Sequence, residues 1–242
     1  MIDIHNHVLP NIDDGSKSIE MSLNMLKCAH EQGITDVVNT VHFQHPSFLD
    51  IDHSLENYER VTKSLQSKLD EYEIPIKIHL GSEVFYYENL LKISNDPLTT
   101  MGGGKYMLIE FPPKNIPDSQ KQTLFDLKMS GVTPIIAHPE RYKLVQENFS
   151  IVYDWINAGC LIQVDSGSIL GSMGQKAMKS SHLIIQENCC HILASDAHND
   201  SNRNFTIKEA HSYVKTVLGT KKADSMVYDH PSSIIRGEDL YF

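Results

Sequence analysis

The chain has 242 residues, 40% of them hydrophobic, and a formal net charge of −10 at pH 7. This length fits one α/β barrel, so we interpret residues 1–242 as a single domain. The negative charge argues against nucleic acid as the main partner. The sequence shows neither a signal peptide nor an apolar run for membrane insertion, which predicts a cytoplasmic protein.

Short apolar runs alternate with stretches of helical periodicity along the chain. We expect seven strands, at 1–5, 34–41, 74–83, 106–111, 133–138, 160–165 and 191–196. Helices are expected between and after them, at about 18–32, 54–72, 118–130, 149–158, 173–187 and 204–217. This alternation predicts βα units and a parallel sheet. The tail from Pro231 onward has little periodicity, and we expect it to pack as an extended segment.

Histidines and carboxylates gather where the expected strands end. Nine such residues form the candidate set: His5, His7, Asp14, His42, Glu83, Glu110, His138, Asp196 and His198. Asp14 read alone belongs to a turn that caps the first helix, and its proximity to His5 and His7 makes it a candidate ligand. Six strands deliver such residues at their carboxyl ends, whereas an open sheet concentrates its site at one switch point. The pattern therefore favours a barrel over an open sheet.

The candidate set offers nitrogen and oxygen ligands and no sulfur. This mixture suits Mn, Fe, Zn, Co or Ni and disfavours a purely structural zinc site. With about three or four protein ligands per open site, two or three metal ions can be held. Such ions activate water and are typical of phosphoester hydrolases. His45, on the same loop as His42, stays undecided as a further ligand.

Two arginines are placed to bind a phosphate group beside these ligands. Arg141 follows His138 by three residues, and Arg203 follows His198 by five. A guanidinium group matches phosphate oxygens with two parallel hydrogen bonds. We therefore interpret Arg141 and Arg203 as catalytic residues.

Three motifs occur in order over nearly the full length: HNHVLPNIDDG, AHPERY and SDAHN. With IEFP at 109–112 and the pattern P-x-x-I-I-x-G-E at 231–238, they resemble the polymerase-and-histidinol-phosphatase (PHP) superfamily. Within it they are similar to the bacterial manganese-dependent tyrosine-protein phosphatases of capsule and exopolysaccharide operons. The chain departs from the pattern at 39–46, where Val41 stands in place of a proline before His42. This leaves the ligand intact and alters the adjoining loop.

The resemblance implies a distorted (β/α)7, TIM-like barrel with a trinuclear site. One metal would be held by His5, His7, Glu83 and Asp196, a second by Glu83, Glu110 and His138, and a third by Asp14, His42 and His198. It also implies that Arg141 and Arg203 bind the phosphate. The family's usual target is the tyrosine-rich tail of a partner autophosphorylating kinase.

We therefore expect a metal-dependent protein-tyrosine phosphatase in which a metal-bridging hydroxide attacks phosphorus. A phenol with a pKa of about 10 departs with less protonation than an alkyl alcohol, which favours phosphotyrosine. One alternative keeps the metals and changes the substrate to a small phosphomonoester such as histidinol phosphate, or to a phosphodiester. Another is a non-catalytic regulator that binds a phosphopeptide. Candidates to line an aromatic slot are Phe43, Phe48, Tyr86, Tyr87 and Phe111, although core packing is expected for most of them.

Overall fold

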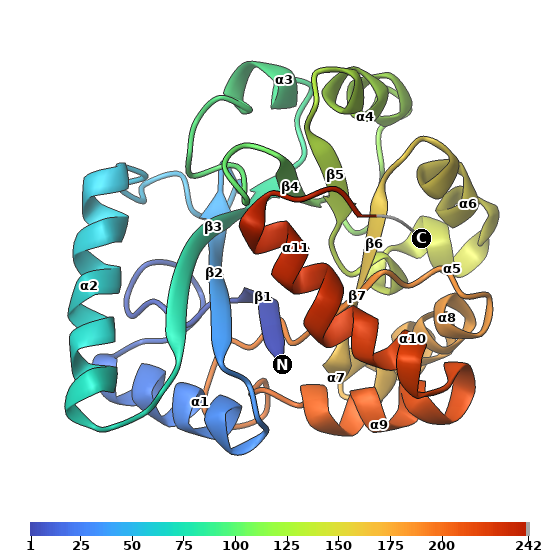
Figure 1. The fold of residues 1–242 in the computed structure, drawn as a ribbon. Helices are drawn as coiled ribbons and strands as arrows, with labels where there is room; N and C mark the ends of the chain where they lie inside the picture. The colour runs from blue at the N-terminus through green and yellow to red at the C-terminus, as the bar shows by residue number, and fades with distance from the viewer. Residues whose placement is uncertain (241–242) are drawn as a thin grey trace.

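A computed structural model describes residues 1–240, and its seven strands pair in parallel in the order in which they occur along the chain. The strands are β1 (Ile2–Asn6), β2 (Asp36–Phe43), β3 (Lys77–Phe85), β4 (Tyr106–Glu110), β5 (Thr133–Ile136), β6 (Leu161–Asp165) and β7 (Ile192–Ala194). Figure 1 shows their arrangement. Each overlaps an expected strand. The prediction of a parallel α/β fold is confirmed.

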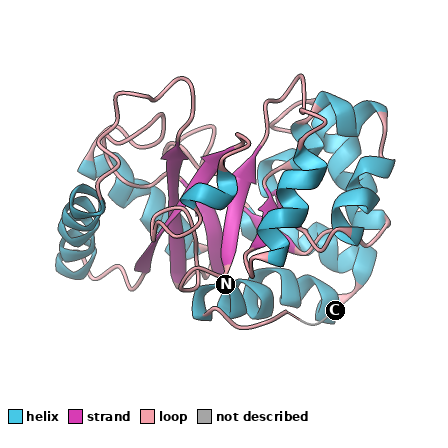
Figure 2. Cartoon of the chain, turned by 90° about the horizontal axis from the view of Figure 1, so that it is seen from above, coloured by secondary structure: helices cyan, strands magenta, loops and turns pink. Residues whose placement is uncertain are grey.

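Helices follow the strands and cover their outer sides (Figure 2). They are α1 (Ile19–Glu31), α2 (Leu55–Glu71), α3 (Leu90–Ile93), α4 (Gln120–Met129), α5 (Lys143–Glu147), α6 (Ser150–Asn157), α7 (Ser166–Ile169), α8 (Gln175–Gln186), α9 (Ile207–Leu218), α10 (Thr220–Asp224) and α11 (His230–Arg236). Serine side chains begin the first two: Ser18 accepts a hydrogen bond from the Met21 amide, and Ser54 accepts one from the Asn57 amide. The six helices expected from periodicity correspond to α1, α2, α4, α6, α8 and α9.

The sheet curls into a nearly closed barrel because β1 and the segment after β7 meet. The His7 amide donates to the Ala197 carbonyl at 2.8 Å, and the Asp196 amide donates to the His5 carbonyl at 2.8 Å. Nearby, the buried Asp3 carboxylate accepts from the Ser195 hydroxyl at 2.6 Å and from the Ser195 amide at 3.1 Å. This seam joins the first and last strands, so the residues that follow both of them lie side by side.

The amino-terminal end of the barrel is filled by apolar side chains. Ile234 of α11 is buried in one cluster with Ile4, Val38 and Leu108. In Figure 1, α11 crosses this end in front of the strands. The expectation of an extended tail after Pro231 was wrong: His230–Arg236 is helical and places Ile234 against the barrel interior. Among residues 1–240, no helix is long and apolar enough to cross a membrane.

Candidate metal centre

All nine candidate residues lie at the carboxyl end of the barrel. His5, His42, Glu83 and Glu110 belong to β1, β2, β3 and β4. Of the others, His7 and Asp14 follow β1, His138 follows β5, and Asp196 and His198 follow β7. Parallel strands direct their carboxyl ends to one mouth, so residues distant in sequence converge there. The structure thus brings together every residue of the set.

The first group of side chains is fully enclosed. His5 Nε2 lies 3.4 Å from Glu83 Oε2 and 3.4 Å from Asp196 Oδ1. His7 Nε2 lies 3.4 Å and 3.3 Å from the same two oxygens. One ligand-type atom from each of these four residues lies within 4.8 Å of the other three. Two imidazoles and two carboxylates therefore surround one point.

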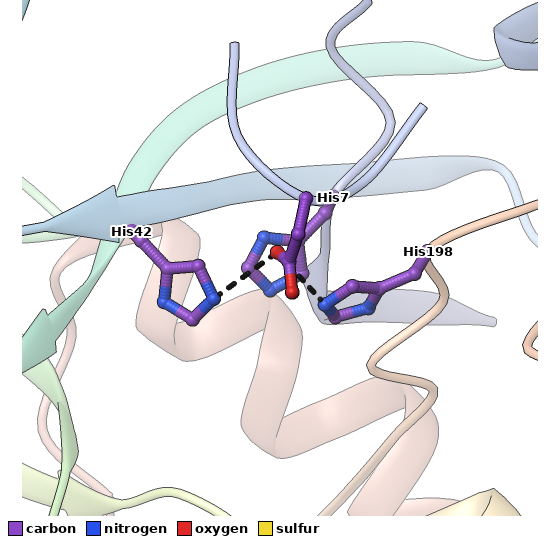
Figure 3. A group of neighbouring side chains, drawn as sticks. His7, His42 and His198 are labelled. Atoms are coloured by element: carbon purple, nitrogen blue, oxygen red, sulfur yellow. Dashed lines mark ion pairs between the residues drawn. The ribbon is translucent and has the colours of Figure 1, made fainter. Parts of the chain in front are cut away.

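The second group opens toward solvent through Asp14, whose side chain is 45% exposed. Asp14 Oδ1 lies 3.3 Å from His42 Nε2 and 3.3 Å from His198 Nε2. Figure 3 shows the His42 and His198 rings pointing toward each other with His7 between them, and its dashed lines mark these two ion pairs. His7 also belongs to this group by distance, so it stands between the first and second groups.

The third group is centred on Glu83 and Glu110. His42 Nδ1 lies 3.2 Å from Glu83 Oε2 and 3.7 Å from Glu110 Oε2. His138 Nε2 lies 2.7 Å from Glu83 Oε1 and 3.9 Å from Glu110 Oε1. His45 Nε2 is 3.8 Å from Glu110 Oε2, so the undecided histidine is at the edge of this group. Both Glu83 and His42 are thus shared between groups.

Several atoms of these groups are buried without a hydrogen bond from any described residue. They are His5 Nε2, His7 Nε2, His42 Nδ1, Glu110 Oε2 and Asp196 Oδ1. A buried polar atom with no partner is costly, and so many in one place require an explanation. Ligand atoms about 2.1 Å from one ion lie roughly 3.0–3.4 Å apart, which matches the separations in the first two groups. The residues present therefore fit divalent metal ions.

Crowding of carboxylates has a clear electrostatic effect. Burial, and then the charges of Glu83 and Asp196, raise the pKa of Glu110 well above its ordinary value. Burial, and then the Arg141 guanidinium, lower the pKa of His138 to about 4, which keeps its imidazole neutral and able to bind a metal. A bound cation would remove the repulsion among the acids.

Two candidate ligands sit on left-handed backbone. The φ angle is 32° at His138 and 48° at Asp196, a region that residues other than glycine rarely adopt. Both follow the ends of their strands, where the unusual turn redirects the side chain into the mouth. Such strain costs about 1–3 kcal/mol per residue and is concentrated at functional sites.

Asp13 is a supporting residue that the sequence reading missed. Its Oδ2 lies 2.7 Å from His7 Nδ1 and accepts from the His42 amide at 3.1 Å, while its Oδ1 accepts from the Gly15 amide at 2.9 Å. Asp13 therefore orients one histidine and fixes the strand that carries another. The available signal was an aspartate six residues after His7, but its turn-like context favoured a helix cap.

Arg141 and Arg203 both reach the outer oxygen of Asp196. Arg141 Nη1 and Arg203 Nη2 each lie 2.7 Å from Asp196 Oδ2, while Asp196 Oδ1 faces the imidazoles. A cavity of about 220 Å³ lies over the cluster, and both arginines line it. The Asp196 carboxylate thus connects the candidate ligands to two guanidinium groups, which lie at the edge of a cavity of small-molecule size.

Of the five aromatic residues considered for a slot, Phe48 lines this cavity. Its ring stacks on His42 with centroids 5.0 Å apart and an interplanar angle of 13°. Tyr86 and Phe111 are core residues, and Phe43 packs against that core. Tyr87 borders a separate surface groove. The expectation that most of the five serve core packing holds for three of them.

Comparison with known proteins gives a consistent result. A family model described as "Capsular polysaccharide synthesis, CpsB/CapC" matches residues 1–236. A putative tyrosine-protein phosphatase CapC of Staphylococcus aureus is 34% identical over 210 residues, covering 86% of this chain and 81% of that protein. The tyrosine-protein phosphatase YwqE of Bacillus subtilis is 31% identical over 242 residues, covering 100% of this chain and 94% of that protein.

Solved structures agree with the sequence matches. One structure, from work on YwqE of Bacillus subtilis and CpsB of Streptococcus pneumoniae, superimposes with a TM-score of 0.92 at 30% identity. The match covers 100% of this chain and 96% of that chain, and those proteins are described as unique metal-dependent tyrosine phosphatases. The PHP-like barrel expected from the motifs is thereby confirmed.

Proposed function

The chain belongs to the CpsB/CapC family of capsular polysaccharide synthesis, and from this premise we propose how its own residues perform the family's reaction. It is a metal-dependent tyrosine-protein phosphatase of the kind linked to capsule synthesis. The observation that carries the residue assignments is the set of buried ligand-type atoms without a hydrogen-bond partner among the described residues, which lie beside Arg141 and Arg203.

We assign the nine residues to three overlapping metal sites. His5, His7, Glu83 and Asp196 would hold one ion, Glu83, Glu110 and His138 a second, and Asp14, His42 and His198 a third. The separations support these sets, and His7 and His42 each lie between two of them. Two or three divalent ions, with manganese as the proposed species, would lower the pKa of a bound water and offset the charge of the phosphate.

The arginines supply the remaining positive charge. With Asp196 Oδ2 between them, Arg141 and Arg203 are held 2.7 Å from a common anchor and border the cavity that a phosphoryl group would enter. The two guanidinium groups are already in place when negative charge develops on the phosphate oxygens. They can stabilise that charge without any rearrangement of the site during the reaction. Arg141 and Arg203 are therefore the proposed catalytic residues.

The wall of the same cavity supports tyrosine as the leaving group, and membership of the family supports a partner in capsule synthesis. Phe48 and His42 form a stacked pair at its wall, against which the ring of a phosphotyrosine can lie. We propose that the natural substrate is a phosphotyrosine-bearing tail of a partner kinase in capsule or exopolysaccharide synthesis. The seam joins β1 to the segment after β7, and α11 then packs against the barrel interior, which supports one domain over 1–242. The cytoplasmic location stays a prediction.

Hydrolysis of a phosphotyrosyl peptide and of histidinol phosphate by the Mn²⁺-loaded protein tests this function. We expect the peptide to be hydrolysed with the higher kcat/KM and activity to disappear on chelation. A strong preference for histidinol phosphate would mean that the substrate is a small phosphomonoester and not phosphotyrosine. Phosphopeptide binding without turnover in the loaded protein would replace the catalytic function with a regulatory one.

A further inference from the structure

Strand β6 contributes none of the nine candidate ligands, yet it directs two polar side chains into the site. Gln163 and Asp165 are fully buried and two residues apart, so their side chains leave the strand on the same side. Polar groups buried in the middle of a barrel require partners. Theirs are a candidate metal ligand and a catalytic arginine.

The two carboxylate oxygens and the backbone amide of Asp165 each face a different residue. Oδ1 accepts a hydrogen bond from Gln163 Nε2 at 3.1 Å, and Oδ2 pairs with Arg141 Nη2. Its backbone amide donates to Glu140 Oε1 at 3.0 Å. Glu140, also fully buried, precedes Arg141 in the sequence, so this bond ties the end of β6 to the turn that carries the arginine.

These bonds determine the orientation of the Gln163 amide. A carboxylate can only accept hydrogen bonds, so the NH₂ group of Gln163 must face Asp165 and its carbonyl oxygen must face the other way. That oxygen lies 2.8 Å from His5 Nδ1. His5 Nδ1 therefore carries the proton, and His5 Nε2 presents its lone pair toward Glu83 and Asp196.

The same carboxylate fixes Arg141. Asp165 Oδ2 holds Nη2, and Asp196 Oδ2 holds Nη1 at 2.7 Å, so two carboxylates from different strand ends set the plane of the guanidinium. A planar group held at both terminal nitrogens keeps one orientation toward the cavity. Without Asp165, the ion pair with Asp196 would remain among the described residues, and it holds one of the two terminal nitrogens.

We propose that Asp165 is a positioning residue for both halves of the site. Through Gln163 it sets the tautomer in which His5 binds a metal, and directly it holds Arg141 in the plane that receives phosphate. The proposal rests on the metal and phosphate roles given above. Residues of this kind, which hold the groups that touch the metal or substrate, typically change metal affinity or activity about 10–100-fold when replaced.

Asp165→Asn is the decisive variant. An amide has one acceptor oxygen, so it can serve Gln163 or Arg141 but not both. We expect Mn²⁺ affinity, measured by calorimetry on metal-free protein, to fall about tenfold or more. We also expect inhibition by inorganic phosphate at saturating Mn²⁺ to weaken by a similar factor. Asp36→Asn, which removes a carboxylate paired with His79 far from the site, is the matched control and should change neither.

Gln163→Met separates the two roles. It removes the His5 partner and leaves the Arg141 pair, so Mn²⁺ affinity should fall while phosphate inhibition stays near that of the wild type. Gln120→Met is the control, because Gln120 is equally buried and accepts from Trp155 Nε1 at 2.8 Å. In an Arg141→Ala background, Asp165→Asn should weaken Mn²⁺ binding and leave phosphate inhibition unchanged.

Two results would overturn the proposal: wild-type Mn²⁺ affinity and phosphate inhibition in folded Asp165→Asn protein, or a full additional loss of phosphate inhibition in the Arg141→Ala background. The calorimetric measurement needs no substrate. A wild-type protein that binds Mn²⁺ but does not hydrolyse phosphotyrosyl peptide would therefore contradict the proposed function, while the loss of affinity in Asp165→Asn would still decide the role of Asp165 toward His5.

Discussion

The two ends of the barrel are built on opposite principles. At the amino-terminal end, α11 places Ile234 among Ile4, Val38 and Leu108, and the backbone at Gly102 approaches Gly237 closely. At the carboxyl-terminal end, imidazoles face carboxylates: His7 Nε2 lies 3.3 Å from Asp196 Oδ1, and neither atom has a hydrogen-bond partner among the described residues. Apolar packing closes one end, whereas the other leaves buried polar atoms without hydrogen bonds from the described residues.

This difference shows how the fold tolerates a costly site. The carboxyl end holds like charges together and keeps His138 and Asp196 on left-handed backbone, both of which destabilise the folded state. The amino end and the seam hold the strands in place regardless. Substitutions at the two ends should therefore separate activity from stability.

The largest effect is expected for Glu83→Gln. Glu83 contacts His5, His7, His42 and His138, and its replacement removes the charge shared by two proposed metal sites. Turnover of phosphotyrosyl peptide should fall about a thousandfold or more. The melting temperature of the metal-free protein should stay close to that of the wild type, because an amide fills the same volume. A large fall in the melting temperature would show that the carboxyl end of the barrel also stabilises the fold.

Arg141→Ala should come next, with kcat/KM reduced about 10²–10³-fold because a preorganised donor to the phosphate is lost. The control is Arg236→Ala at the other end of the molecule, where an exposed arginine pairs with Glu238 at 2.7 Å. It should leave kcat/KM unchanged. Equal effects of the two variants would mean that Arg141 acts only through overall charge.

Gly102→Ala tests the amino-terminal end. A Cβ atom at Gly102 would lie 2.3 Å from the Ile234 carbonyl oxygen, so helix α11 must shift. Beyond the backbone strain, we expect a loss of about 1–3 kcal/mol in the free energy of unfolding. Gly103→Ala is the matched control, since its φ of +69° resembles the +63° of Gly102 but its Cβ would meet nothing within 4 Å. Chemical denaturation measures the difference, and equal losses in both variants would discount the close approach. Activity per folded molecule should be unchanged in both.

The smallest effect is expected for Asp36→Asn. Asp36 Oδ1 lies 2.9 Å from His79 Nε2 in a partly exposed pair at the start of β2 and β3, which is worth less than about 1 kcal/mol. Burial acts to raise the pKa of Asp36, but the hydrogen bond from His79 and other contacts lower it overall. The lowered pKa means that this contribution is present above about pH 4 and is lost as the pH falls through the folded-state pKa. Stability curves of wild type and variant should therefore converge in acid, and a gap that widens there would contradict this.

Much of the architecture follows from local sequence patterns. Runs such as TPIIAH are apolar at successive positions because both faces of the strand are covered, and the candidate ligands lie at their ends. Helix α11 escaped prediction because its short run of seven residues carries little periodicity, and only contact with the barrel interior reveals why Ile234 is buried.

The supporting residues were harder to foresee than the candidate ligands. Gln163 lies 158 positions from His5, and nothing in the local sequence links them. Asp165 ends an apolar strand as the candidate ligands do, but its role depends on Arg141 and Gln163 as partners. Two polar residues alternating within CLIQVD were the available signal, since they must share one side of a buried strand.

The nine side chains at the carboxyl end of the barrel are proposed to hold metal ions. Anomalous diffraction from crystals grown with Mn²⁺ measures this directly. We expect two or three strong peaks at the carboxyl end of the barrel, one of them between the imidazoles of His5 and His7 and the carboxylates of Glu83 and Asp196. The absence of anomalous density at the carboxyl end of the barrel, in protein that still hydrolyses phosphotyrosyl peptide, would contradict the assignment of these residues to metal sites.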